Sequence, residues 1–382
     1  MKFHSGFLIL LLAISMIFLT PHPAQAFPHY SRKYKMPCWK CHQMNFPKLN
    51  ADGEKFASLG KRFPVDIKDR KEYPFKFAEA TTFMTRLQNS ARQTNTANTS
   101  ALAIHSVQVF STSSLGRNLA YHLEYYFYEE GNPLWAEAFL QYNSTGSNRY
   151  FSVKVGQFEP LLWTKQGLSN RISISRPDVM NTRVGNGNSY RIRDRQRGVE
   201  LAGYSGPWTL AASVVDGAGP NVLDSNNQRD LILQGYYAFP KGQGSSIGAY
   251  YYKGIGTARP SKKPTFEDDF YRLGLVGNYT KDSYEIDGGA FYGRNQTVTG
   301  SVQPSFGYFA ALEKDFGDHY VGFARYDHFD PDKSKSDDET QGWTLGIDKM
   351  VLTNMKLTGE ARWRRVGTNP ENSTVLQLLM VF

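Results

Sequence analysis

The residues with the clearest chemistry are Cys38, Cys41 and His42, which stand in the pattern C-x-x-C-H. Two thiols at this spacing can form thioether bonds to the two vinyl groups of one porphyrin, and the adjacent histidine can bind its iron as the proximal ligand. The chain has no other cysteine. A thioredoxin-like redox pair would need a βαβ context and a zinc site would need a second Cys/His pair, and neither is visible. The motif therefore predicts one covalent heme c.

The sixth ligand of that iron is not fixed by the motif. The candidates nearest in sequence are His29, Met36 and Met44. Met84 and His122 could also reach the iron if the heme sits inside a barrel. A methionine ligand would raise the reduction potential relative to a histidine ligand. The distal ligand stays open at this point.

The residues before the motif predict export. Phe7 to Leu19 is an apolar run of 13 residues that follows Lys2, and Ala24-Gln25-Ala26 has the small-x-small form of a cleavage site. Such a run is too short to span a bilayer. We therefore interpret residues 1–26 as a secretory signal peptide.

Residues 27–75 are expected to form a mono-heme cytochrome c segment. They contain 11 lysines and arginines against 5 aspartates and glutamates. This basic charge would suit heme propionates or the docking of an acidic electron carrier, or it could be an ordinary solvated surface. So short a segment can bury little core beyond its porphyrin.

The elements that must position this segment are strands. Aromatic residues make up 14% of the chain and there are 34 glycines. Tyr121, Leu123 and Tyr125 alternate with His122 and Glu124, which is the pattern of a half-buried strand. We count sixteen such segments, at about 76–91, 101–114, 117–130, 134–146, 149–159, 195–206, 207–217, 228–240, 245–257, 268–281, 282–295, 302–315, 318–329, 340–350, 353–366 and 373–382.

The connections between these segments indicate a membrane barrel. Every even-numbered segment is followed by a short link, whereas most odd-numbered ones are followed by a long polar link. Outer-membrane barrels have this asymmetry, with short turns and both termini in the periplasm. Residues 376–382 alternate apolar positions and end in Phe382, which resembles the assembly signal of bacterial outer-membrane proteins. A soluble sandwich or propeller would not explain the loop lengths, and no propeller-length repeat is visible.

The predicted fold is therefore all-β. Residues 76–382 should form an outer-membrane, porin-like antiparallel β-barrel of about 16 strands, preceded by the minimal heme segment. That segment would lie on the periplasmic side or inside the barrel lumen. Since 21% of the residues are charged, a bundle of transmembrane helices is excluded.

The longest connection, at about 160–194, is rich in arginine. Arg191, Arg193, Arg195 and Arg197 alternate, so an extended chain would place all four on one face. The connection could fold into the pore and pair with anions or heme propionates, or it could be a solvated outer loop. The sequence leaves both alternatives open.

Acidic clusters occur in other connections. They could concentrate cations at the outer mouth or bind divalent iron, although solvated loop charge is the simpler interpretation. The clusters are Glu129-Glu130, Glu267-Asp268-Asp269 and Asp337-Asp338-Glu339.

The N-terminal residues resemble a known family. The run from Phe27 to Tyr34, the C-x-x-C-H motif, Pro47-Lys48-Leu49-Asn50 and Gly53-x-x-Phe56 are similar to the fused outer-membrane cytochrome–porins of iron-oxidising bacteria. The resemblance implies a mono-heme head in or under a barrel that carries electrons from extracellular Fe(II) to periplasmic c-type cytochromes. It implies that Cys38, Cys41 and His42 bind the heme, and it points to no iron-binding residue.

The expected function is thus an outer-membrane electron-transfer conduit. One heme cannot span an apolar band about 25 Å tall, so a small redox partner should enter the lumen from outside. The alternatives are an anion-selective porin whose heme is structural or sensory, and electron export to an extracellular acceptor. We see no Ser/His/Asp arrangement, Walker loop or zinc motif. The expected partners are outer-membrane lipid and the electron carriers, and no nucleic acid.

Overall fold

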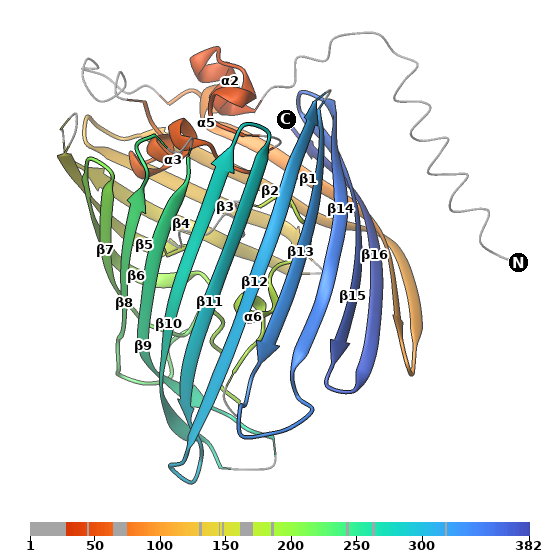
Figure 1. Cartoon of the computed structure of the whole chain (residues 1–382). Helices are drawn as coiled ribbons and strands as arrows, with labels where there is room; N and C mark the ends of the chain where they lie inside the picture. Colours follow the sequence, from red (N-terminus) through yellow and green to blue (C-terminus); the bar gives the residue numbers. More distant parts are fainter. Residues whose placement is uncertain are drawn as a thin grey trace, which may run out of the picture.

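The computed structural model describes residues 28–43, 46–63, 75–129, 132–144, 146, 149–160, 171–184, 187–241, 244–261, 264–317 and 319–382. In this part of the chain sixteen strands form one closed barrel (Figure 1). Each strand pairs antiparallel with its sequence neighbours, and β1 pairs with β16 to close the wall. The all-β, 16-stranded barrel expected from the sequence is confirmed. The predicted signal peptide lies outside the described residues.

The strands have the following bounds: β1 (Thr81–Thr94), β2 (Asn98–Ser114), β3 (Leu119–Glu129), β4 (Asn132–Asn143), β5 (Arg149–Phe158), β6 (Gln196–Ser205), β7 (Trp208–Val215), β8 (Asp230–Ala238), β9 (Ser246–Ala258), β10 (Phe266–Lys281), β11 (Tyr284–Gln296), β12 (Val302–Gly317), β13 (Tyr320–Asp330), β14 (Thr340–Leu352), β15 (Met355–Val366) and β16 (Asn369–Val381).

The helices are short. They are α2 (His29–Tyr34), the 3₁₀ turn η1 (Cys38–Lys40), α3 (Ala51–Ser58), α5 (Phe77–Ala80) and α6 (Asp178–Asn181). None of the helices in the described part of the chain is long and apolar enough to span a membrane. The first strand begins later than expected from the sequence. Residues 77–80 (FAEA) contain good helix formers and make one turn, and the β-branched Thr81 and Thr82 then start β1.

The wall of the barrel has an apolar outside and a polar inside. Tyr121, Leu123 and Tyr125 of β3 stand outward, whereas His122 and Glu124 are buried inside, as the alternation predicts. The large aliphatic side chains that stand outward on other strands are well exposed; they include Leu201, Leu210, Leu233, Leu275, Ile286 and Ile347. This belt is what an outer-membrane barrel presents to lipid.

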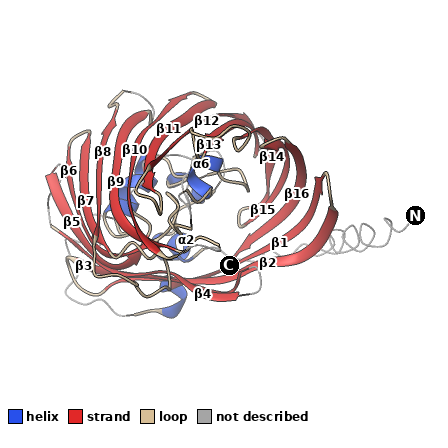
Figure 2. Ribbon diagram, turned by 90° about the horizontal axis from the view of Figure 1, so that it is seen from below, coloured by secondary structure: helices blue, strands red, loops and turns tan. Residues whose placement is uncertain are grey.

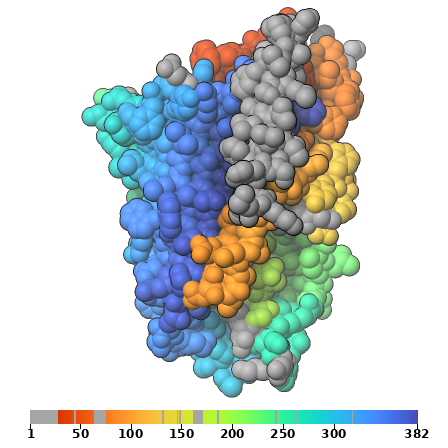
Figure 3. Space-filling model, turned by 90° about the vertical axis from the view of Figure 1, so that its right-hand side faces the viewer, coloured from red at the N-terminus to blue at the C-terminus, as the bar shows by residue number. Residues whose placement is uncertain are grey.

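The two ends of the barrel differ. The links after even-numbered strands are short, and they lie at the same end as the N-terminal helices and the C-terminus (Figure 1). We call this the short-turn end and the opposite one the long-loop end. In the space-filling view the orange strands β1 and β2 lie directly beside the dark blue C-terminal strands (Figure 3), because Met84 of β1 pairs with Val381 of β16 and the ladder continues to Thr94.

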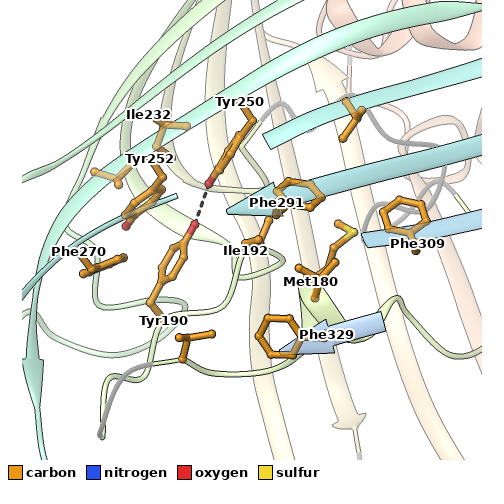
Figure 4. Packing of buried hydrophobic residues seen from close by; sticks show 14 of the residues in the cluster. Met180, Tyr190, Ile192, Ile232, Tyr250, Tyr252, Phe270, Phe291, Phe309 and Phe329 are labelled. Atoms are coloured by element: carbon orange, nitrogen blue, oxygen red, sulfur yellow. Dashed lines mark hydrogen bonds between the residues drawn. The ribbon is translucent and has the colours of Figure 1, made fainter. Parts of the chain in front are cut away.

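Residues 171–184 and 187–195 of the connection between β5 and β6 lie in the lumen, where α6 lies inside the ring of strands (Figure 2). They build a hydrophobic core inside the barrel (Figure 4). Met180 and Ile192 come from the connection and meet inward aromatic residues of the strands, and the Tyr190 hydroxyl lies 2.7 Å from that of Tyr250. The Asp178 carboxylate accepts from Arg362 on β15, at 2.6 Å. The folded-in alternative is therefore the one that this chain adopts.

Residues 28–63, which we call the head, close the short-turn end. The Lys48 side chain is fully buried between two strands, with its ammonium 2.8 Å from the Glu285 carboxylate of β11 and also bonded to Glu313 of β12. On the other side of the barrel Arg62 donates to the backbone carbonyls of residues 116–119, in the turn between β2 and β3. These two buried cations fasten the head to opposite stretches of the wall.

Replacing Lys48 with methionine should loosen the head. Glu285 and Glu313 would remain buried without their cation, and breaking a buried ion pair typically costs roughly 3–5 kcal/mol. We expect protease to cleave the head of Lys48→Met much faster than that of the unchanged protein, while heat-modified electrophoresis still shows a folded barrel. Lys76→Met removes only an exposed pair with Glu79 and serves as the control. Equal digestion of the two variants would contradict the docking role.

Candidate functional site

The C-x-x-C-H residues form a tight loop on the head. The backbone N–H groups of Cys41 and His42 both donate to the Cys38 carbonyl, at 3.1 and 3.0 Å. Asn50 supports the loop from behind: its backbone N–H donates to the Cys41 carbonyl at 3.0 Å, and its Nδ2 donates to the Trp39 carbonyl at 3.1 Å. Hydrogen bonds at both ends therefore hold the loop in one conformation.

Helix α3 packs directly against this loop. A Cβ atom on Gly53 would lie 2.0 Å from the Cys41 carbonyl oxygen, so only glycine permits the approach. Three positions later Phe56 is buried and contacts Tyr30 edge-on, with ring centroids 4.9 Å apart, and it also meets Tyr34. The spacing Gly53-x-x-Phe56 thus places one contact on the loop and the other in the small core of the head.

Cys38, Cys41 and His42 all line a large cavity in the lumen. The cavity has a volume of about 1220 Å³, which exceeds the roughly 300–1,000 Å³ of ordinary small-molecule sites. Cys38 and Cys41 are free thiols, and burial raises the pKa of each. The size of the cavity and its two thiols fit a large planar group with two points of attachment.

His42 is oriented by backbone carbonyls. Its Nδ1 lies 3.1 Å from the Lys48 carbonyl oxygen and 3.2 Å from that of Pro47, so Nδ1 carries the proton and donates. Burial lowers the pKa of this ring, which favours the neutral imidazole. Nε2 is then left with its lone pair. A carbonyl that fixes the tautomer of a histidine in this way is typical of metal-binding histidines.

His29 is the best-placed candidate for a second iron ligand. Its side chain is 3% exposed, its Nδ1 lies 2.5 Å from the Thr82 hydroxyl, and its backbone N–H donates to the same oxygen at 2.8 Å. Its Nε2 is buried and has no hydrogen-bond partner, and His29 lines the same cavity as His42. Burial lowers the pKa of His29 well below its ordinary value. A neutral, oriented imidazole with a buried unpartnered nitrogen fits an axial iron ligand.

The other candidates fit less well. Met36 lines the cavity but is 39% exposed, and Met84 lines it from the β1 wall. His122 is buried, with Nδ1 2.6 Å from the Thr112 hydroxyl and Nε2 3.3 Å from the Glu137 carboxylate. Met44 lies outside the described residues.

His122 belongs to an ion network that the sequence did not reveal. Donor atoms of His122, Glu124 and Glu137 lie within 4.8 Å of one another, a grouping that could hold a metal ion. The Lys61 ammonium of the head lies 2.8 Å from His122 Nε2, and Arg195 pairs with Glu124 at 3.2 Å. Two cations therefore already compensate the two carboxylates, and the network ties the head to the wall rather than offering an open cation site.

The predicted row of arginines does not exist as a row. A turn interrupts the extended chain, because the Asp194 N–H donates to the Arg191 carbonyl at 3.0 Å. The members consequently take separate partners: Arg191 pairs with Asp194 at 2.9 Å, Arg195 with Glu124 at 3.2 Å and Arg197 with Asp216 at 2.7 Å. Val199 and Leu201 have the same parity as the four arginines but stand outward, so an inward row would need a bulge near Gly198. Gly156 of β5 and Gly198 of β6 pair in continuous register, and no such bulge is formed.

Several arginines face the lumen cavity without an acidic partner. Among the described residues, no carboxylate lies within ion-pair distance of Arg86, Arg176 or Arg193, all of which line the cavity beside Arg171. Burial, followed by repulsion from Arg171 and Arg193, lowers the pKa of Arg176 well below its ordinary value. Burial and the nearby Arg86 lower the pKa of Arg171 to about 10. Part of the cavity wall is therefore cationic, although carboxylates such as Glu54, Glu129 and Glu159 also line the cavity.

The acidic clusters are mostly used within the protein. Asp268 is fully buried and accepts from Asn188 at 2.8 Å and from Asn295 at 2.5 Å. Asp269 pairs with Lys253. Asp337 and Asp338 stay in the outer loop, and Glu130 lies outside the described residues. The clusters thus do not combine into one cation site within the described loops.

Four further residues of the site carry no signal in the sequence: Thr82 orients His29, Arg86 lines the cavity, and Glu285 and Glu313 hold Lys48. They are ordinary inward positions of strands. A polar residue at an inward position is the rule in a barrel of this kind, so nothing in the local pattern marks these four.

Comparisons with known proteins bear on the fold. No protein-family model matches the sequence, and no curated protein matches it either. The anion-selective porin from Comamonas acidovorans is similar in structure, with a TM-score of 0.61, 13% identity and coverage of 79% of this chain and 99% of that porin.

Two further barrels agree with this. The outer membrane channel DcaP of Acinetobacter baumannii has a TM-score of 0.57 at 11% identity, covering 81% of this chain and 100% of the channel. OmpT of Vibrio cholerae in its trimer form has a TM-score of 0.55 at 12% identity, and the match covers 79% of this chain and 100% of OmpT. The chain therefore has the porin barrel fold, which together with the apolar outer belt supports a location in the outer membrane.

Proposed function

We propose that this chain is an outer-membrane electron-transfer protein that carries a single heme c in the lumen cavity, accepts electrons from extracellular Fe(II) and passes them to a periplasmic c-type cytochrome. The observation that carries the proposal is that His29, whose Nε2 is buried and has no hydrogen-bond partner, lines the same cavity as Cys38, Cys41 and His42. Burying a polar atom without a partner costs roughly 1–3 kcal/mol. An axial bond to iron would offset that cost.

Each residue has a definite part in holding the group. Cys38 and Cys41 would form the thioether bonds, and His42 would bind the iron through Nε2 while its Nδ1–H donates to backbone carbonyls. His29 would bind through Nε2, oriented by Thr82. When bound, the heme would supply one-electron redox chemistry. Two histidine ligands would give a lower potential than a histidine and a methionine.

The two ends of the barrel suit different redox partners: a small molecule at the long-loop end and a protein at the short-turn end. The head closes the short-turn end, so an external partner would enter from the long-loop end, past the arginines of the β5–β6 connection. On the head, the Trp39 side chain is 73% exposed and is followed in sequence by Lys40, which pairs with Asp52 at 2.5 Å, while Lys35 is exposed on the same segment. An exposed tryptophan among lysines is a suitable contact for an acidic electron carrier.

A second candidate function is an anion-selective porin with a structural or sensory heme. The cationic cavity wall favours it, and the structural neighbour from Comamonas acidovorans is described as anion-selective. Planar-bilayer conductance separates the two functions. A conduit closed by its head should pass little current, whereas high anion conductance that is unchanged in the absence of heme would favour the porin.

The direction of electron flow distinguishes iron oxidation from electron export. A redox titration of the purified protein with Fe(II) as the donor measures the potential directly. Oxidised protein that takes no electrons from Fe(II), either hydrated or as a chelate, would exclude the iron donor and favour export to an extracellular acceptor.

The double variant Cys38→Ala/Cys41→Ala should lose covalent heme and still insert as a barrel, because the closed wall buries its own apolar belt. Peroxidase staining after denaturing electrophoresis reports the covalent heme, and heat-modified mobility reports the barrel. The single variant His42→Ala should keep its stained band but change its absorption spectrum. A stained band that survives in the double variant would refute the attachment site.

His29→Ala should convert the heme from a six-coordinate low-spin to a high-spin spectrum, because it removes the distal imidazole. His29→Met should keep a low-spin heme and raise its reduction potential. His328→Ala changes a histidine on β13 that stacks on Tyr308 away from the cavity, and it should match the unchanged protein. If His29→Ala leaves the spectrum intact while Met36→Ala alters it, the distal assignment is wrong.

Accessibility on intact cells should follow the two ends of the barrel. A tag inserted at Lys335, in the link between β13 and β14, should be labelled by a membrane-impermeant reagent. A tag at Gly206, in the short turn between β6 and β7, should be labelled only after the outer membrane is opened. The reverse pattern would place the head outside the cell and exclude inward electron transfer through it.

A further inference from the structure

The least compensated charges inside the barrel are arginines. Arg86 projects from β1 and donates to Ser106 and Gln108, whereas Arg176 and Arg193 come from the β5–β6 connection. The Nε atoms of Arg176 and Arg193 are buried and have no hydrogen-bond partner. All three line the cavity that the head closes. They form a cationic wall, which we call the lumen arginines, on the path from the long-loop end to the head.

Unpaired guanidinium groups that lie close together raise the free energy of the folded protein unless an anion binds beside them. Guanidinium groups in one partly desolvated cavity repel one another, and unused N–H donors lose their hydrogen bonds to water. Other cations of the same cavity are already paired: Lys61 with the His122 network, Arg195 with Glu124, Lys154 with Glu200 and Lys356 with Asp348. The lumen arginines, in contrast, form no ion pair with a carboxylate of the described residues.

The chemistry of these donors selects the ligand. Planar guanidinium groups bind carboxylate and other oxyanions through paired N–H···O bonds, and several of them around one space suit a ligand with several such groups. A hydrated divalent cation would instead meet like charge on this wall. The lumen thus favours anions over the free ferrous ion.

We propose that the lumen arginines bind a multivalent carboxylate or oxyanion, and that the external redox partner enters the barrel as an anionic iron complex rather than as hydrated Fe(II). The second half of this inference rests on the proposed function. A chelated Fe(II) would give up one electron to an oxidised heme held by Cys38, Cys41 and His42, and it would leave as the chelated Fe(III) with no ligand or proton transferred. The arginines hold the complex in the lumen near the closed end.

The propionates of a bound heme are also carboxylates, so they could pair with the lumen arginines in place of an external anion. The two sources differ in what heme removal does. An external ligand would bind in the presence of heme, whereas propionates would block the site until the heme is absent.

The binding test uses citrate and isothermal titration calorimetry at low ionic strength. We expect the oxidised holoprotein to bind citrate. Each arginine contributes a charge-assisted hydrogen bond, so each of the two changes in Arg176→Gln/Arg193→Gln should weaken the affinity for citrate by roughly tenfold or more. Arg229→Gln removes an exposed arginine paired with Asp224 and should bind citrate normally. Absorbance of the heme and heat-modified mobility confirm that each variant is loaded and folded.

Two binding outcomes would overturn the proposal. Citrate binding only to Cys38→Ala/Cys41→Ala would show that propionates fill the site in the loaded protein. Equal affinity in Arg176→Gln/Arg193→Gln and in the unchanged protein would show that the lumen arginines are not the site.

The kinetic test follows heme reduction in a stopped-flow instrument with two donors, ferrous citrate and Fe(II) in a non-coordinating buffer. We expect ferrous citrate to be faster, and its advantage to disappear in Arg176→Gln/Arg193→Gln and at high salt. Equal rates for both donors, unaffected by the arginine changes, would overturn this inference and leave the proposed function standing. Heme that neither donor reduces would instead refute the iron donor of the proposed function, while the citrate titration still tests the site.

Discussion

A sixteen-stranded barrel encloses more space than the inward side chains of its own strands can fill, and the rest of this structure follows from that constraint. Pairing β1 with β16 removes the last free sheet edges, but it leaves a wide lumen. Two segments of the chain occupy it. The β5–β6 connection brings Met180, Tyr190 and Ile192 into a core with inward aromatics, and the head closes the short-turn end. Between the described parts of these two segments lies the large cavity lined by His29 and His42.

The walls of that cavity have unequal chemistry because they come from different parts of the chain. The head contributes His29, His42 and two thiols, all partly or fully buried. Two contacts position the C-x-x-C-H loop of the head. Gly53 allows α3 to touch the Cys41 carbonyl, and the Pro47 and Lys48 carbonyls accept from Nδ1 of His42. The connection contributes arginines. A redox group held at the head would therefore sit behind a cationic approach.

The cationic side chains inside the barrel fall into two groups. Lys48 and Arg62 are completely enclosed and fully bonded, and they fasten the head where a loss of contact would open the barrel end. Arg86, Arg176 and Arg193 border the cavity, and none of them forms an ion pair with a carboxylate of the described residues. The first group stabilises the assembly, because its partners repay the cost of desolvation only in this geometry. The second group leaves donors available to a ligand.

The sequence by itself determined the barrel. Alternation with a period of two and the difference between short and long links are local properties, and they were enough to predict a closed sheet and, for the strand around Tyr121–Tyr125, the two faces that the structure shows. The predicted start at Lys76 was early, because residues 77–80 prefer a helical turn. The heme motif is local as well, and the attachment of heme at Cys38 and Cys41 stays a prediction.

Only the tertiary structure distinguished among the candidates within the site. His29 stands out because Thr82, 53 positions away, binds one nitrogen and leaves the other unpartnered. Lys48 is buried because two strands more than two hundred residues later supply carboxylates. The expected arginine row was wrong because a turn at Arg191–Asp194 breaks the extended chain. Contacts of this kind leave no mark on the residues next to either partner, since they depend on how the closed barrel brings distant inward positions around one space.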